Sequence, residues 1–351
     1  MAHPELSERE RQVLEAVIRS YVETAEPAGS RTISRRFGLG VSPATIRNTM
    51  SDLEEKGFLY HPHTSAGRIP TDKAYRAYVD ALMDREPGVF PERERLAEQL
   101  GERGSAIETI LRRAAQSLGV LTQELGVALG PRLDLTILQK LELVRMNSQR
   151  LILVLTLGGG SVRTIFIEIA GEIADHAIIV VQDVLNERLG GLSLAEIRAT
   201  LGSRLRDAAP TGGGATELLN IFVQEGDQLF EVGTLGEEES VVLGQASLLA
   251  DKPEFATGER MKQLITLTET RTQLATLLRQ RTAIPGSSGV SITIGDEHGS
   301  QLLGGLTLVT SEYRAGTLTG VIGVIGPTRM PYEKVIALVT HTSSLVTDLL
   351  A

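Results

Sequence analysis

Residues 30–71 read SRTISRRFGLGVSPATIRNTMSDLEEKGFLYHPHTSAGRIPT, and this stretch decides the fold of the N-terminal part of the chain. Ser30 is a natural N-cap for a short helix that ends at Gly38. Ser42 precedes a proline at the first helical position, which begins a second helix that runs to Lys56. The stretch therefore predicts two helices joined by a tight turn.

Strand patterns follow the second helix directly. Phe58–Tyr60 and Arg68–Pro70 suit two short strands joined by a turn, and Thr71 then caps a further helix. Upstream, a capping-box pattern that begins at Ser7 precedes an amphipathic helix. Three helices followed by a β-wing predict a winged helix-turn-helix domain over residues 1–90.

The outward residues of the second helix suit base recognition, because the N-terminal part of such a helix meets base edges in the major groove. Arg47 suits guanine, Asn48 suits adenine, and Thr45 suits the methyl group of thymine. The predicted DNA contacts on the two helices and the wing are Arg31, Arg35, Ser42, Ala44, Thr45, Arg47, Asn48, Ser51, His61, His63 and Arg68.

Other interpretations of this stretch stay open. The polar residues of one helix also fit an ordinary solvated face, and winged helices also serve as protein-interaction modules. His61 and His63 flank Pro62 in a pattern that suggests metal, but two histidines without a third nearby ligand make a weak site. The sequence therefore predicts no metal.

The net formal charge of -9 argues, by itself, against a nucleic-acid partner. The distribution of charge argues the other way, because residues 31–51 carry Arg31, Arg35, Arg36 and Arg47 and no acidic residue. Screening limits the reach of a charge to about 10 Å at 0.1 M salt. The local sign of the helix-turn-helix therefore favours attraction to phosphate.

The rest of the chain alternates between helical and strand patterns. Residues 91–125 suit connecting helices, and residues 178–250 form a second helical block. Strand patterns cover 138–146, 150–157, 162–169, 290–294, 302–311 and 317–325, and a last helix covers 332–350. Gly158–Gly160 suits a hairpin turn better than a phosphate cradle, since no Lys-Ser/Thr pair follows it. The pattern predicts an α+β sheet domain with a helical insertion.

No catalytic motif accompanies this architecture. The chain has no cysteine, and neither G-x-S-x-G nor H-E-x-x-H occurs. Asp296, Glu297 and His298 suit a solvated hairpin, and Arg329 suits an anchor that binds backbone carbonyls. There is no signal core and no run of 18 apolar residues, so we expect a cytoplasmic protein without a membrane partner, a cofactor or an enzymatic activity.

Three stretches together resemble the heat-inducible transcription repressor HrcA family. They are VSPATIRNTMSDLEEKGFLYHPHTSAGRIPTDKAYRAYVD at 41–80, LNERLGGLSLAEI at 185–197 and GVIGVIGPTRMPYEKVI at 320–336. The resemblance implies a homodimeric repressor of chaperonin and chaperone operons that binds double-stranded DNA at an inverted-repeat operator called CIRCE. It also implies that a GroEL-type chaperonin assists the active state, which heat stress then removes.

The family fold implied by the resemblance is a winged helix, a GAF-like antiparallel sheet domain and an inserted, mainly helical dimerisation domain. In this chain a boundary at Pro87-Gly88 would be followed by connecting helices at 91–125. The GAF-like domain would cover 126–175 and 251–351, with the insertion at 176–250.

Two other classes of function stay open. A ligand-sensing winged-helix regulator would use the GAF-like domain as its receptor. A hydrolase or transferase would assemble an acid and a base in a pocket without a sequence signature. The exact operator bases, the genes controlled and the temperature of inactivation do not follow from the sequence.

Overall fold

The computed structural model describes residues 6–63, 66–85, 88, 90–100, 107–131, 135–158, 162–169, 171, 173–206, 213–230, 241–281, 289–316 and 318–351. Pro87 of the expected domain boundary and Gly159 and Gly160 of the expected turn lie outside these residues. The chain divides into two compact units. The first comprises Met1–Ala128, Val242–Glu312 and Val321–Val346, and the second comprises Leu129–Val241, Tyr313–Gly320 and Thr347–Ala351.

The first unit begins with the winged helix that the sequence predicts. Its elements are α1 (Glu8–Thr24), α2 (Ser30–Phe37), α3 (Pro43–Glu55), the wing strands β1 (Leu59–Tyr60) and β2 (Ile69–Pro70), and α4 (Asp72–Met83). The side chains of Ser7, Ser42 and Thr71 accept the N-terminal hydrogen bonds of α1, α3 and α4, as expected. Ser30 does not cap α2, because it is already helical and the extended Gly29 takes the cap position.

Among the residues that the structure describes, five strands form the main sheet, in the order β7-β3-β10-β9-β8. They are β3 (Leu125–Leu129), β7 (Val241–Leu243), β8 (Val290–Ile294), β9 (Leu306–Ala315) and β10 (Leu318–Pro327), and β8 pairs with β9 in antiparallel register. The accompanying helices are α5 (Glu92–Leu100), α6 (Ile107–Thr122), α10 (Ser247–Ala250), α11 (Gly258–Glu269), α12 (Arg271–Arg281) and α13 (Tyr332–Leu350), with 3-10 turns η3 (Pro253–Phe255), η4 (Gly295–His298) and η5 (Gln301–Leu303).

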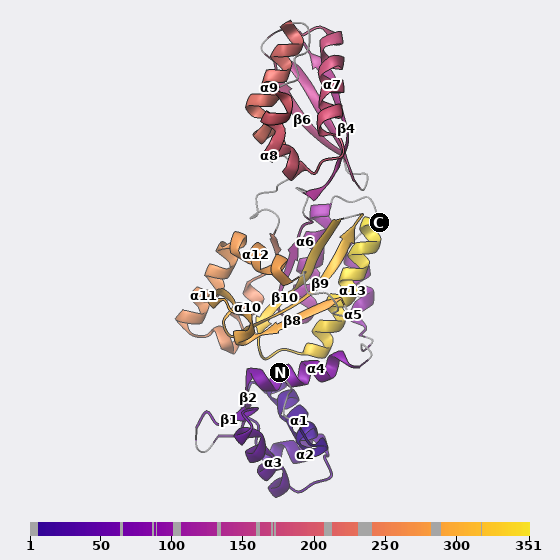
Figure 1. Cartoon of the computed structure of the whole chain (residues 1–351). Helices are drawn as coiled ribbons and strands as arrows, with labels where there is room; N and C mark the ends of the chain where they lie inside the picture. The colour runs from indigo at the N-terminus through magenta and orange to yellow at the C-terminus, as the bar shows by residue number, and fades with distance from the viewer. Residues whose placement is uncertain are drawn as a thin grey trace. The chain divides into compact units, whose positions relative to one another are not determined.

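Close packing around β10 explains why its sequence repeats glycine. A Cβ atom on Gly323 would lie 2.1 Å from the carbonyl oxygen of Val309, and one on Gly326 would lie 2.1 Å from Oε2 of Glu124. On β9, the Thr307 hydroxyl lies 3.0 Å from the hydroxyl of Tyr332, which holds α13 alongside the sheet (Figure 1). The glycines thus let side chains and carbonyls of neighbouring strands approach β10.

The second unit has its own sheet, β4-β5-β6, in which both pairs are antiparallel. The strands are β4 (Leu138–Asn147), β5 (Arg150–Leu157) and β6 (Val162–Glu168), and the helices are α7 (Asp175–Leu189), α8 (Leu194–Leu205) and α9 (Gly213–Leu229). Alternate leucines of β5, among them Leu151, Leu153 and Leu155, form one core with Leu185 and Phe222 of the helices. Figure 1 shows α7, α8 and α9 beside this sheet.

This arrangement corrects the expected grouping of strands. Residues 138–169 do not join the sheet of the C-terminal strands, because α7 to α9 bury their apolar face instead. Two strands of the main sheet were not predicted: β3 begins where the expected connecting helices end, and β7 lies inside the helical block expected at 178–250. Both are short apolar runs, and periodicity alone does not distinguish a buried strand from buried helix.

The outer edge of β4, which has no neighbouring strand among the described residues of this sheet, forms hydrogen bonds with side chains of α7. The amide of Asn186 accepts a hydrogen bond from the Leu141 N–H at 2.8 Å and donates one to the Leu141 carbonyl at 2.7 Å. Oε1 of Gln182 accepts one from the Leu143 N–H at 2.9 Å. These amides therefore take the place of a neighbouring strand along part of β4.

Among the helices of the described residues, none has the length and apolar character needed to cross a membrane.

Candidate nucleic-acid interface

The helix-turn-helix presents its polar side because its apolar side is fully buried. Ile33 of α2 and Ile46 and Leu53 of α3 are each 0% exposed. Gly38 and Gly40 in the turn have φ values of 56° and 68°, a left-handed conformation that glycine adopts at little cost. The remaining faces of α2 and the first half of α3 are thereby left on the surface.

Three arginines give this surface its charge. Arg31, Arg35 and Arg47 are exposed, and none of them forms an ion pair with a carboxylate of the described residues. Arg36 differs, because its guanidinium pairs with Glu23 of α1 and lies over the ring of Phe37. The structure thus leaves three of the four predicted cations exposed, and no carboxylate of the described residues pairs with them.

The polar residues of α3 divide into two groups. The hydroxyls of Ser42 and Ser51 form hydrogen bonds within the helix. The Ser42 Oγ accepts from the Thr45 N–H at 3.1 Å, and the Ser51 hydroxyl donates to the Arg47 carbonyl at 3.3 Å. The Thr45 hydroxyl also lies 2.9 Å from the Ser42 Oγ. By contrast, Ala44, Arg47 and Asn48 are exposed, so they are the residues of α3 most available to a base edge.

The wing is fastened to the helices by a carboxylate that the sequence analysis missed. Glu54 of α3 lies 2.7 Å from Nδ1 of His61 and accepts from the Arg68 guanidinium at 2.8 Å. The Arg68 side chain is only 12% exposed. Arg68 thus anchors the wing in this structure, and its contact with DNA stays a prediction, whereas His63 is exposed. No spacing pattern relates Glu54 to its partners.

A backbone bridge completes the wing. The N–H groups of Ala28 and Arg68 donate to each other's carbonyl oxygens, both at 2.9 Å, so the segment between α1 and α2 pairs with the strand that returns from the wing. A Cβ atom on Gly67 would lie 2.4 Å from the Ala28 carbonyl oxygen, which makes glycine necessary there. The sequence gives no sign of this pairing, because a single bridge has no periodicity.

An ion pair fixes the far end of α3. Lys56 lies 2.6 Å from Oε1 of Glu10, whose other oxygen accepts from the Ser7 backbone at 2.8 Å. The hydrogen bond from Lys56, followed by that from Ser7, lowers the pKa of Glu10 to about 2. Glu10 therefore remains ionised near neutral pH and ties α1 to the end of α3.

Polar contacts also join the winged helix to the main sheet within the first unit. Arg76 of α4 donates to Glu297 at 2.7 Å and to the Ile292 carbonyl at 2.7 Å. Arg329 donates to the Val22 carbonyl at 2.8 Å and pairs with Glu254. Arg329 binds a backbone carbonyl, as expected. Residues 296–298 form the 3-10 turn η4 and not a hairpin: Asp296 and Glu297 are exposed, as expected, although Glu297 also binds Arg76, whereas His298 is buried.

No group of three possible metal ligands among His, Cys, Asp and Glu occurs in the part of the chain that the structure describes.

The comparisons agree with a regulator of this kind. A family model described as "HrcA protein C terminal domain" matches residues 108–336. A heat-inducible transcription repressor HrcA of Chlorobium limicola is 39% identical over 360 residues, which cover 100% of this chain and 99% of that protein. The protein of the same name from Geobacter sulfurreducens is 38% identical over 348 residues, with 99% and 98% covered.

One solved structure supports the fold alone. A crystal structure of a hypothetical protein at 2.2 Å resolution is 22% identical to this chain, and the match covers 99% of both chains with a TM-score of 0.66.

Proposed function

The chain belongs to the HrcA family of heat-inducible transcription repressors, which are non-enzymatic regulators, and we propose that it acts in the cytoplasm as a homodimer on an inverted-repeat CIRCE operator. The observation that carries this proposal is the exposed, uncompensated cationic face of Arg31, Arg35 and Arg47 beside Asn48. Two copies of α3 would enter successive major grooves, since the half-site spacing must match the dimer.

A gel shift at several salt concentrations tests this proposal. We expect the full chain to bind an inverted-repeat duplex far more tightly than a single half-site or a scrambled duplex. The affinity should fall steeply with salt, because binding at phosphates releases counterions. Equal affinity for the half-site and the inverted repeat would contradict binding as a dimer.

Arg47→Ala separates base reading from phosphate binding. If Arg47 reads a guanine, its loss should cost about 1–3 kcal/mol on the operator and relax base preference at one position. Arg112→Ala is the matched control. Arg112 is exposed on α6, so this substitution removes the same charge at a site outside the winged helix. Equal weakening by Arg47→Ala on operator and scrambled DNA would assign Arg47 to a phosphate instead.

We propose that the five-stranded sheet and its helices form the GAF-like domain and that residues 129–241 of the second unit form the inserted dimerisation domain. The topology supports an insertion, because residues 129–241 connect β3 to β7 and these two strands are neighbours in the main sheet. Such an insertion leaves the host sheet intact. This division begins the insertion near Leu129 and not at 176.

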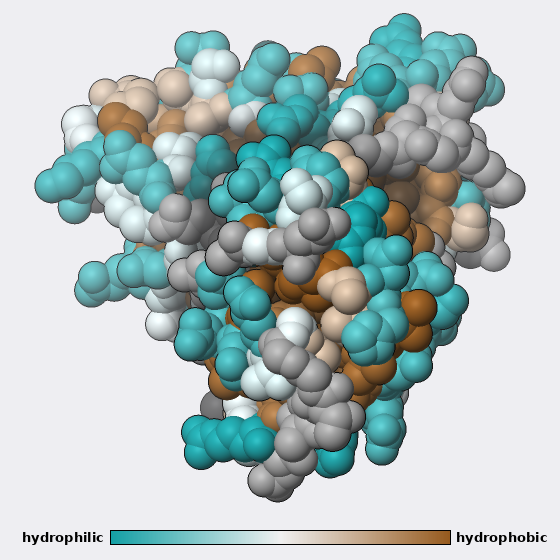
Figure 2. Space-filling view, turned by 90° about the horizontal axis from the view of Figure 1, so that it is seen from above, coloured by the Kyte–Doolittle hydropathy of each residue, from teal (hydrophilic) through white to brown (hydrophobic). Residues whose placement is uncertain are grey.

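An apolar sheet face supports pairing through the second unit. Opposite the face that α7 to α9 cover, the cross-strand row Val144, Ile152 and Phe166 points outward, and Phe166 is 64% exposed. Two further apolar residues of this sheet are exposed, Met146 at 54% and Val162 at 60%. A second copy packed on the row of Val144, Ile152 and Phe166 would remove it from water. In the view from above, Figure 2 shows that apolar residues of the chain also reach the surface between hydrophilic ones.

Phe166→Asp tests this interface. We expect the variant to sediment as a monomer and to lose the preference for the inverted repeat over the half-site. Ile265→Asp is the matched control, because Ile265 on α11 is 50% exposed and belongs to the first unit. A Phe166→Asp variant that remains dimeric would exclude this face.

The family resemblance supports a final part of the proposal, in which a GroEL-type chaperonin assists the active state. A marginally stable fold would give an active fraction that chaperonin raises and that heat lowers when other clients occupy the chaperonin. Refolding with and without chaperonin, followed by operator binding, tests this. Equal operator occupancy in both samples would remove chaperonin from the mechanism.

A further inference from the structure

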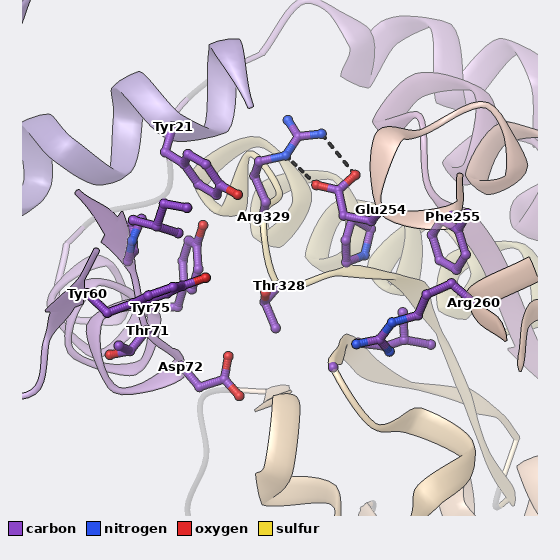
Figure 3. A pocket seen from close by; sticks show the side chains of 15 residues that line it. Tyr21, Tyr60, Thr71, Asp72, Tyr75, Glu254, Phe255, Arg260, Thr328 and Arg329 are labelled. Carbon is purple, nitrogen blue, oxygen red and sulfur yellow. Dashed lines mark hydrogen bonds and ion pairs between the residues drawn. The ribbon is translucent and has the colours of Figure 1, made fainter. Parts of the chain in front are cut away.

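A cavity of about 470 Å³ lies in the first unit, between the winged helix and the main sheet. Its walls come from the wing, the start of α4, the start of α11 and the segment between β10 and α13, and Figure 3 shows it from close by. Cavities of about 300–1,000 Å³ hold small organic molecules in proteins. None of the roles proposed above uses this space.

A buried hydroxyl in the wall lacks a partner. Tyr75 of α4 is 2% exposed, and its hydroxyl has no hydrogen-bond partner among the described residues. Burial raises the pKa of this hydroxyl well above its usual value, so it remains a proton donor. The ring is held in place by Tyr332, whose centroid lies 5.8 Å away. Because buried polar groups are nearly always hydrogen-bonded, this donor indicates an acceptor that enters from the cavity.

The cavity also presents one positive group without a carboxylate. The guanidinium of Arg260 donates to the Gln263 side chain and to the Gly304 carbonyl, both at 2.9 Å, and forms no ion pair within the described residues. Gly305 has a φ of 69°, and a Cβ atom there would lie 2.8 Å from this guanidinium. Glycine at this position therefore leaves the charge accessible.

A negative group without a cation lies on another wall. Asp72, at the start of α4, accepts a hydrogen bond from the Asp296 backbone, and its pKa is raised by burial and by the carboxylates of Asp296 and Glu297. It forms no ion pair among the described residues. Arg329 does not offset it, because Arg329 is already paired with Glu254. Figure 3 shows Asp72 and Arg260 on different walls with open space between them.

We propose that this cavity binds a small zwitterion of the amino-acid class, with its carboxylate on Arg260, its ammonium group on Asp72 and a further acceptor on the Tyr75 hydroxyl. A simple anion would leave Asp72 uncompensated, and a simple cation would do the same to Arg260. A molecule that carries both charges neutralises both walls. The rings of Tyr60 and Phe255 supply apolar walls for the rest of the molecule.

Binding at this place would connect two parts of the first unit. Asp72 and Tyr75 belong to α4 of the winged helix, whereas Arg260 belongs to α11 beside the main sheet. A ligand that contacts both stabilises their present arrangement by an amount that increases with the ratio of its free concentration to its Kd. This makes ligand binding measurable without DNA and independent of the proposed operator.

The test uses the whole 351-residue chain without DNA. Each standard L-amino acid, and ω-amino acids such as γ-aminobutyrate, is added singly at millimolar concentration, and Tm and calorimetric binding are measured. We expect at least one to raise Tm and bind at a single site. Its N-acetyl and amide derivatives should bind at least about tenfold more weakly, since each lacks one charge-assisted contact.

Variants assign the binding to this cavity. Arg260→Gln and Tyr75→Phe should each weaken binding of the amino acid, Arg260→Gln by about tenfold or more and Tyr75→Phe by less. Tyr75→Phe keeps the ring against Tyr332, so it preserves the fold. Lys262→Gln is the control, because Lys262 is exposed on the same helix as Arg260. The proposal is overturned if no amino acid binds, if the derivatives bind equally well, or if Arg260→Gln binds like the unaltered protein.

Discussion

Replacing Asn186 should loosen β4 from α7 within the second unit. In the unaltered protein the Asn186 side chain bonds to the Leu141 N–H at 2.8 Å and to the Leu141 carbonyl at 2.7 Å. In Asn186→Leu, both of these buried backbone groups lose their partner. An unsatisfied backbone group costs about 1–3 kcal/mol, and burial of the leucine side chain returns part of that cost. We therefore expect a loss of about 2–4 kcal/mol in the stability of this unit.

Gln182→Leu provides the graded comparison. Gln182 accepts only one backbone hydrogen bond, from Leu143 at 2.9 Å, so its replacement should cost about 1–2 kcal/mol. Asn186→Asp should fall between the unaltered protein and Asn186→Leu, because aspartate still accepts from the Leu141 N–H but no longer donates to its carbonyl.

Hydrogen exchange measured by mass spectrometry suits this prediction, because it reports the opening of one segment in a protein with several domains. The peptide that contains β4 should exchange faster in Gln182→Leu than in the unaltered protein, and faster still in Asn186→Leu. The exchange of peptides from the winged helix should remain unchanged. Val144 lies on the same strand, so Asn186→Leu should also weaken the proposed dimer. A loss below about 0.5 kcal/mol, or an equal loss in both leucine variants, would refute the reasoning.

Three further predictions concern single residues. Gly67→Ala should weaken operator binding by displacing the wing, because its Cβ would lie 2.4 Å from the Ala28 carbonyl oxygen; a gel shift will measure this, with Gly258→Ala as the control, because a Cβ on Gly258 meets nothing within 4 Å. Glu10 has a folded pKa of about 2 against an ordinary 4.5, so its contribution to stability is present above pH 4.5 and lost as the pH falls toward 2. Acid unfolding of Glu10→Gln should therefore depend less on pH across that range. Burial raises the pKa of Glu124 to about 7 despite Lys252, so stability should decline as the pH rises from 4.5 to 7, and Glu124→Gln should flatten that decline in thermal melts.

The winged helix could be predicted from the sequence because its signals are local. The caps at Ser7, Ser42 and Thr71 and the apolar spacing of Ile46 and Leu53 each lie within a few residues of the element that they define. Such signals agree with one another, which is what a foldable sequence requires.

The partition of the strands could not be predicted in the same way. β5 has the same alternating pattern whether its leucines face α13 or face α7 to α9, and only the tertiary structure decides between these partners. The same limit applies at the candidate interface. Exposure of Arg47 and Asn48 follows from helix periodicity, whereas the pairing of Glu54 with Arg68 joins a helix to a strand through a wing of no fixed length.

The residues that hold the winged helix on the main sheet suggest where its DNA binding is controlled. Arg76 donates hydrogen bonds to Glu297 and to the Ile292 carbonyl, and Arg329 donates one to the Val22 carbonyl near the end of α1. None of these residues belongs to the exposed face of α3. A repressor that reads an inverted repeat needs two recognition helices at one fixed spacing, so a change at these contacts alters binding without touching a base. Because the cavity of Asp72 and Arg260 lies among the same contacts, a ligand there would act on operator affinity through the orientation of the winged helix rather than through the residues that read DNA.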